Sequence, residues 1–227
     1  MLYIDPSQDI ALRHKFRAHV DHSKFPCLGA KSALARGTLR IEICHDIRSG
    51  WDDLRTHEIL VEWSRNYGAR PTGFRSLAFV YRTARNLTER EFEEAMWARL
   101  QSLSDKDAWR GTPYDPAVSA DPSDPHFSLS FGGQAYFVVG LHPGASRPAR
   151  TFIRSVLVFN LHNQFEVLRR EGRYEKFREA ILKRDANLAG DRNPMLARHG
   201  EISEARQYSG RAVGPDWRCP FHDRRGN

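Results

Sequence analysis

The chain has 227 residues, which is enough for one large domain or two small ones with a substantial buried core. Hydrophobic residues make up 40% of it and charged residues 28%, a composition that excludes a largely disordered protein. The net charge of +7 suits an anionic ligand as well as nucleic acid, but no recognition-helix, zinc-finger or RNA-binding signature accompanies the scattered Lys and Arg residues. We therefore expect no nucleic-acid partner.

No apolar run approaches the roughly 20 residues that a membrane helix requires. The first residues also lack the basic and apolar regions of a signal peptide. Cys27, Cys44 and Cys219 form no CxxC pair, so neither a disulfide framework nor a four-ligand zinc site is expected. Together these features predict a cytoplasmic protein without a membrane partner.

The first fifth of the chain predicts two helices and a strand. One helix is expected over 7–20 and a shorter one over 28–36, with Gly37 as its stop signal. Apolar and polar residues alternate over 38–44, which predicts a strand with one buried face. Cys44 is out of phase with that face, so we expect it to be the cysteine with the least functional role.

A second helix–strand–helix pattern follows. A helix is predicted over 49–67, with an apolar stripe that includes Trp51, and a buried strand over 76–81. Thr88 and Glu91 have the spacing of a capping box before the stripe of the next helix.

The middle of the chain predicts a long loop and a hairpin. The loop spans 105–125 and is rich in Asp, Pro, Gly and Ser; loops of this length are often functional. Trp109 and Tyr114 within it could belong to a lid or simply pack on the surface. Gly132-Gly133 predicts a two-residue turn in a hairpin over 126–141.

The last third contains one strand and two helices, predicted over 154–159, 164–170 and 174–185. About five strands among helices predict an α+β fold with a mixed, mainly antiparallel sheet. No repeat or linker divides the chain, so we expect one domain over 1–227, with loose termini at 1–6 and 222–227.

Cys27 directly precedes a short helix, where the helix dipole and free N–H groups favour a thiolate. Lys31, on the same helical face, would add a positive charge. A poised thiolate can be a nucleophile, a redox centre or a soft metal ligand, whereas the alternative is a buried structural cysteine. As a nucleophile, Cys27 could pair with His142.

His142 ends a predicted strand, where histidine often acts as a ligand or base but can also form only a structural hydrogen bond. Arg147 and Arg150 follow, and either could bind a carboxylate or phosphate or be solvated at the surface. Cys219 precedes a proline, as in some haem-binding segments, although that match is two residues long.

Six separated segments resemble the YqcI/YcgG family in the same order along the chain. They are 25–31, 137–143, 146–150, 193–196, 205–211 and 217–221. Members of this family with an assigned activity are haem-dependent N-hydroxylases that act on guanidino nitrogens. The resemblance therefore implies a monooxygenase with haem b (iron protoporphyrin IX), O2, an external reductase and an arginine-like guanidine or amine substrate.

The resemblance also implies roles for particular residues. Cys27 becomes the expected axial ligand of the haem iron, because a thiolate ligand favours O–O cleavage, and His142 is the alternative ligand. The implied cofactor-binding set is Cys27, Lys31, His142, Arg147, Arg150, Arg211 and Cys219. Candidate partners for the haem propionates are Arg147, Arg150, Arg206 and Arg211. The candidate catalytic residues are His142, Arg206 and Tyr208. The candidate acids for a cationic substrate are Asp46, Asp52 and Asp53.

Two other functions stay open on the sequence. One is a non-catalytic haem-binding or sensing protein in which Cys219 is a labile ligand. The other is a cofactor-free hydrolase that uses Cys27 and His142.

Overall fold

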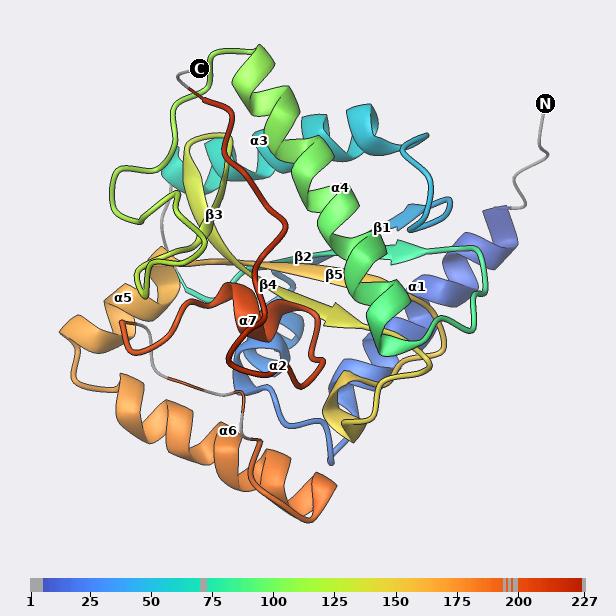
Figure 1. The fold of residues 1–227 in the computed structure, drawn as a ribbon. Helices are drawn as coiled ribbons and strands as arrows, with labels where there is room; N and C mark the ends of the chain where they lie inside the picture. Colours follow the sequence, from blue (N-terminus) through green and yellow to red (C-terminus); the bar gives the residue numbers. More distant parts are fainter. Residues whose placement is uncertain (1–5, 70–72, 194, 196, 198–199, 226–227) are drawn as a thin grey trace.

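One open sheet of five strands, in the order β1-β2-β5-β4-β3, organises the fold (Figure 1). The computed structural model describes residues 6–69, 73–193, 195, 197 and 200–225. The strands are β1 (Leu39–Cys44), β2 (Ser76–Tyr81), β3 (Leu129–Phe131), β4 (Gln134–Leu141) and β5 (Val156–Leu161). β1 and β2 are parallel, and the other neighbouring pairs are antiparallel. The predicted α+β class and mixed sheet are confirmed.

Helices cover both faces of this sheet (Figure 1). In the described residues they are α1 (Pro6–Asp21), α2 (Leu28–Ala35), α3 (Asp53–Ala69), α4 (Glu89–Trp109), α5 (Asn163–Arg170), α6 (Tyr174–Ala189) and α7 (Ala205–Tyr208), with a 3-10 turn, η1 (Pro148–Arg150). α3 and α4 lie on one face, whereas α1, α2 and α6 lie on the other (Figure 1). Over the described residues, no helix has both the length and the apolar character needed to cross a membrane.

Strand alternation divides the buried residues into two cores. On β2, Leu77 and Phe79 point toward α3 and α4, in what we call the α4-side core. Ala78 points the other way, toward Phe16 of α1, in the α1-side core. The two cores lie back to back, because successive side chains of a strand point to opposite faces of the sheet.

Three local signals in the sequence form as predicted. The Thr88 hydroxyl accepts from the Glu91 N–H at 3.3 Å, and the Glu91 carboxylate accepts from the Thr88 N–H at 2.9 Å, so the capping box at the start of α4 is confirmed. Gly132 and Gly133 have φ values of 57° and 74°, as a two-residue hairpin turn of this type requires. Gly37 follows α2 with φ 69°.

The helix predicted over 49–67 begins later, at Asp53, and ends at Ala69. Ser49, where the predicted helix would start, forms a local turn instead, in which its hydroxyl accepts from the Trp51 N–H at 3.2 Å. Trp51 is therefore turned outward and 85% exposed, so its assignment to the apolar stripe is wrong.

The long loop begins five residues later than predicted, at Arg110, because α4 continues to Trp109. Trp109 is 87% exposed. Tyr114 packs inward instead: its hydroxyl donates to the Ser128 carbonyl at 2.6 Å, and its ring lies 4.4 Å from the Arg225 guanidinium carbon. Tyr114 thus anchors the loop beside β3.

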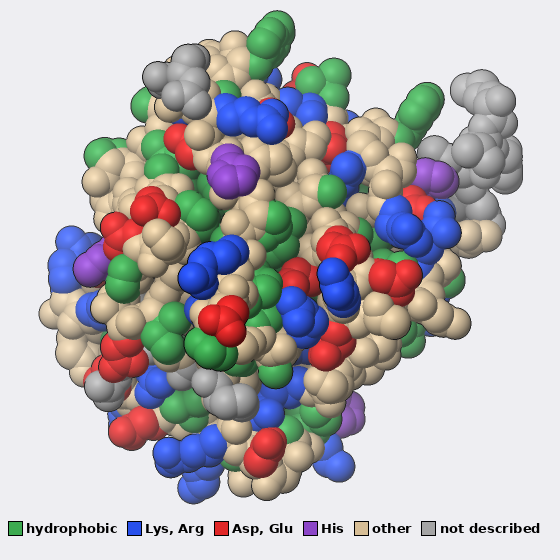
Figure 2. Space-filling view, viewed as in Figure 1, with side chains coloured by type: hydrophobic (Ala, Val, Ile, Leu, Met, Phe, Trp, Pro, Cys, Tyr) green, Lys and Arg blue, Asp and Glu red, His purple; other side chains and the backbone are tan. Residues whose placement is uncertain are grey.

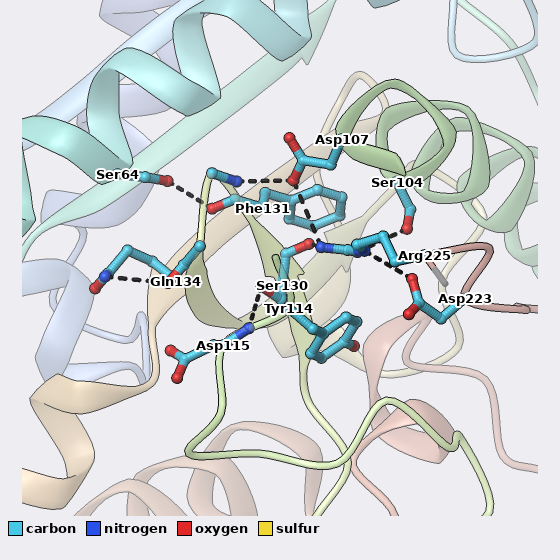
Figure 3. Close-up of polar contacts among 12 residues, drawn as sticks. Ser64, Ser104, Asp107, Tyr114, Asp115, Ser130, Phe131, Gln134, Asp223 and Arg225 are labelled. Carbon is cyan, nitrogen blue, oxygen red and sulfur yellow. Dashed lines mark hydrogen bonds and ion pairs between the residues drawn. The ribbon is translucent and has the colours of Figure 1, made fainter. Parts of the chain in front are cut away.

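The segment 222–225 is packed against the domain, so the expectation of a loose end is wrong there (Figure 3). The Arg225 guanidinium donates to the Ser104 hydroxyl at 2.9 Å and to the Asp223 carboxylate at 2.7 Å. Because the Arg225 side chain is only 8% exposed, these bonds hold the chain end against α4 and the hairpin.

Parts of two predictions lie outside the described residues. For the loose termini these parts are residues 1–5 and 226–227, and for the resembling segment 193–196 they are Pro194 and Leu196. Pro6, which was also expected in a loose terminus, is the first residue of α1.

Basic and acidic side chains are interspersed over the face in Figure 2. Ion pairs also bring side chains of the two signs together; for example, Arg85 pairs with Asp46, and Arg90 pairs with Glu94 at 3.1 Å. The chain has a net charge of +7, but its basic side chains do not form one continuous basic patch on this face.

Candidate ligand cavity

A cavity of about 240 Å³ lies against the α1-side face of the sheet, between α2 and α6. Its lining is mostly apolar. Alternation along β4 turns Phe137 and Val139 toward the cavity, and the helical spacing of α6 does the same for Phe177 and Ile181. Such a cavity, with a few polar groups in its wall, is the usual form of a small-molecule or cofactor site.

Cys27 lines this cavity at the N-terminus of α2. Its backbone is extended, and its sulfur accepts from the Ala30 N–H at 3.5 Å, so Cys27 is the N-cap of the helix. Pro26 cannot continue a helix backwards, and this fixes where α2 begins. The predicted position of Cys27 before a short helix is confirmed.

The predicted thiolate at Cys27 is not favoured, because burial raises the pKa of its thiol. The backbone N–H groups of Ala30 and Gly29 and the charge of Arg150 oppose this shift without cancelling it. Lys31 does not help, since its ammonium donates to the carbonyls of Asp21 and His22 at 2.8 Å each. Lys31 thus satisfies the end of α1 and is not part of the cavity lining.

Arg150 is the buried cation of the cavity wall. Its guanidinium donates to the carbonyls of Gly140 and Tyr208, both at 3.2 Å, and of Gln207 at 2.9 Å. Burial lowers the pKa of Arg150 to about 10, so the group is still protonated at neutral pH. Arg150 therefore brings a positive charge to a mostly apolar cavity.

Arg147 lies beside the cavity but not in its lining. It donates to the Asp185 carboxylate at 2.9 Å and to the Asp191 carboxylate at 3.0 Å. Asp185 itself lines the cavity from α6. Arg147 therefore ties α6 to the loop after β4 and closes one side of the cavity.

His142 lies on the other face of the sheet. Its ring stacks on Phe92 of α4, with ring centroids 4.2 Å apart, and burial lowers its pKa to about 4. Its Nδ1 atom is buried and has no hydrogen-bond partner in the described part of the chain. The structure does not bring His142 together with Cys27, so these two residues do not form a catalytic dyad.

Four predicted site residues lie in the C-terminal segment and are not in the described cavity lining: Arg206, Tyr208, Arg211 and Cys219. Arg206 donates to the Trp217 carbonyl at 3.4 Å, and the Tyr208 hydroxyl donates to the Tyr136 carbonyl at 3.3 Å. Arg211 donates to the Glu93 carboxylate at 3.0 Å. These contacts hold the segment in place and use the polar groups internally.

The other two cysteines are separated from Cys27. Cys219 packs against the α4-side core, and burial raises its pKa to about 12. Cys44 points to the same side, 3.6 Å from the Thr56 hydroxyl, and burial raises its pKa to about 12 as well. The prediction that Cys44 is out of phase with the inner face of its strand is confirmed.

The three aspartates considered for a cationic substrate are near α3, not in the cavity lining. Asp46 pairs with Arg85, Asp52 accepts from the His45 N–H, and Asp53 lies 3.0 Å from Arg99. Two other carboxylates, of Asp185 and Glu204, line the cavity instead. Glu204 is buried and accepts from the Ser128 hydroxyl at 2.6 Å.

Sequence reasoning missed Asp185, Glu204 and Gln207. Asp185 stands on the apolar side of an amphipathic helix, which is a detectable signal. Glu204 and Gln207 lie beyond the last predicted helix, 174–185, and the folding back of their segment over the sheet brings them to the cavity.

A family model described as the YqcI/YcgG family matches residues 16–222, which is nearly the whole chain. The chain belongs to the YqcI/YcgG family. Comparison with curated proteins and with solved structures found no match. The family match establishes membership and carries no activity with it.

In this YqcI/YcgG protein, five of the six segments that carry the resemblance contribute to the cavity wall. Their contributions include Cys27, Phe137, Arg150, Asn193 and Gln207. The sixth segment, 217–221, packs against the α4-side core through Trp217, Cys219 and Phe221. The resembling segments, which are far apart in the sequence, thus meet mainly around one cavity.

Proposed function

We propose that this YqcI/YcgG protein binds haem b in the cavity, with Cys27 as the iron ligand, and N-hydroxylates a guanidino or amino nitrogen of a small molecule. The observation that carries the proposal is that Cys27 and the buried Arg150 cation share the wall of one mostly apolar cavity. Membership of the YqcI/YcgG family agrees with this proposal but does not itself assign an activity to the chain.

The residues of the cavity are compatible with this group. Haem is a broad apolar ring with two carboxylates, and the cavity offers apolar walls, a sulfur donor and a guanidinium. Burial raises the pKa of the Cys27 thiol, but a coordinating metal deprotonates a thiol outright. Iron would thus add the positive charge that is needed to outweigh the burial of Cys27, which the charge of Arg150 alone does not cancel.

When bound, a thiolate-ligated haem supplies oxidising chemistry with O2 and electrons from an external reductase. The residues of this chain would do the rest. Cys27 would hold the iron, and the cavity walls would exclude water. Glu204, rather than the three aspartates near α3, would attract a cationic nitrogen, because the Asp185 carboxylate is engaged by Arg147.

The other two functions have less support. A hydrolase that uses Cys27 and His142 would need both side chains on one face of the sheet, and they lie on opposite faces. A sensor with Cys219 as a ligand would bind haem beside the α4-side core, away from the cavity.

Spectroscopy of the purified protein, mixed with ferric protoporphyrin IX, tests cofactor and ligand together. We expect a Soret band, and a ferrous–CO band at the long-wavelength position typical of thiolate ligation. Cys27→Ala should abolish that band, whereas Cys44→Ala, a matched control, should retain it. Absence of a Soret band, or a spectrum changed by His142→Ala and not by Cys27→Ala, would contradict the proposal.

Turnover separates an enzyme from a haem carrier. With NADPH, a reductase and O2, we expect arginine-like guanidines or amines to gain one oxygen atom on nitrogen, detected by mass spectrometry. Haem binding without any such product would favour the non-catalytic alternative.

A further inference from the structure

Arg150 has hydrogen-bonding capacity that the protein does not use. Three of its N–H bonds donate to backbone carbonyls, which leaves the Nε–H and one Nη2–H. In the described part of the chain no carboxylate lies within ion-pair distance of Arg150. Asp185 is near enough to favour the charged form of Arg150, but its carboxylate is engaged by Arg147.

A buried cation without a counter-anion is costly, because backbone carbonyls offer dipoles and not a full negative charge. Three hydrogen bonds fix the guanidinium of Arg150. One is to the Gly140 carbonyl on β4, and two are to the Gln207 and Tyr208 carbonyls in the C-terminal segment. Its position is therefore fixed toward the cavity, and a ligand is the remaining source of negative charge.

Gln207 supplies a second unused polar group in the same wall. Its residue is only 4% exposed and lines the cavity. Its backbone carbonyl accepts from Arg150 at 2.9 Å, but within the described residues its side-chain amide has no hydrogen-bond partner. The amide atoms of Gln207 are not among the fully buried polar atoms, so they keep accessible surface from which a ligand can take or give a hydrogen bond.

We propose that Arg150 and Gln207 form a carboxylate-binding subsite in the cavity wall, which anchors the acid group of an otherwise largely apolar ligand. The planar guanidinium offers two free N–H groups to the two oxygens of a carboxylate, and the Gln207 amide can donate a third hydrogen bond. The apolar residues around the subsite would bury the remainder of the ligand.

Two sources of this carboxylate share the same chemistry. One is a propionate of bound haem, in which case the inference rests on the proposed function. The other is a free organic acid that enters the cavity, which is independent of haem. Each source can be compared with a neutral counterpart of nearly the same shape.

The experiment measures affinity for two matched pairs of probes. Ferric protoporphyrin IX is compared with its dimethyl ester by Soret titration, and dodecanoate is compared with dodecanol by calorimetry. The wild-type protein is tested beside Arg150→Gln, Gln207→Leu and the control Gln101→Leu. Gln101 lies on α4 and is not in the cavity lining. Its side chain hydrogen-bonds to the Asp105 carboxylate and to the backbone of His222.

We expect at least one acid to bind about tenfold or more tightly than its neutral counterpart, as hydrogen bonds to a charged group allow. Arg150→Gln should remove this preference, Gln207→Leu should reduce it, and Gln101→Leu should leave it intact. Gln207→Leu keeps the backbone carbonyl that Arg150 needs, so it tests the subsite even where Arg150→Gln unfolds the protein.

The proposal is overturned if neither acid is preferred over its neutral counterpart, if none of the probes binds, or if the preference survives both cavity variants. Failure of the proposed function is distinct. It would appear as loss of all porphyrin binding while the preference for dodecanoate over dodecanol remains.

Discussion

His57 of α3 and Asp107 of α4 share a fully buried hydrogen bond of 2.7 Å, between the ring Nε2 and the carboxylate Oδ1. The other carboxylate oxygen accepts from the Gly132 N–H at 2.8 Å (Figure 3). One side chain therefore joins two helices and the β3–β4 turn on the α4 side of the sheet. This junction supports the sheet from the face opposite the cavity.

His57→Leu should destabilise the fold by about 3 kcal/mol, because it leaves the buried Asp107 carboxylate with one partner fewer. Urea unfolding measures the effect. The control is His14→Leu, which removes an exposed histidine on α1 and should leave the unfolding midpoint nearly unchanged. Equal midpoints for the two variants would contradict a structural role for the buried pair.

Stability should fall as the pH drops from about 6.5 to about 4, partly because of His142. Burial lowers the pKa of this residue from 6.5 to about 4, so between these values the unfolded chain binds a proton that the folded one does not. Relative to His142→Phe, which keeps the stacking on Phe92, the wild type should lose about 2–3 kcal/mol across this window. Urea unfolding at several pH values measures the difference, and parallel pH profiles would refute it.

Two glycines should respond in opposite directions to replacement by alanine. A Cβ at Gly140 would lie 2.6 Å and 2.8 Å from Phe92 ring atoms, so Gly140→Ala should destabilise the protein by about 1–3 kcal/mol through overpacking. Gly68 lies inside α3 with nothing near its Cβ position, so Gly68→Ala should stabilise by about 0.5–1 kcal/mol. Thermal unfolding compares them; a shift of the same sign in both would show that local space does not decide the outcome.

The three cysteines should react slowly with iodoacetamide at pH 7 in the native protein, since burial raises the pKa of each thiol. Cys27 should react before Cys44, because Cys27 lines the cavity, whereas Cys44 is buried in the α4-side core. Peptide mapping after timed alkylation measures the order. Labelling of Cys27 at the rate of a free low-pKa thiol would restore the thiolate predicted from its place before a helix.

Much of the fold can be predicted locally. The capping box of Thr88 and Glu91 depends on residues three apart, and the turn at Gly132-Gly133 on two neighbours, so tertiary contacts do not alter them. Trp51 is an exception to this local rule. Its apolar side chain fits a helical stripe, but a hydrogen bond within the Ser49 turn places it in solvent.

The sequence by itself determined the family, the α+β class and the position of Cys27 at the start of a helix, because these follow from short-range patterns and ordered motifs. Only the tertiary structure decided which of those motifs meet. Strand alternation sends His142 to the α4 side, while the folded-back C-terminal segment brings Gln207 to Arg150 in the cavity wall. Tertiary structure also decided the state of the Cys27 thiol: burial outweighs the helix N-terminus, and a desolvation energy depends on the whole surrounding fold.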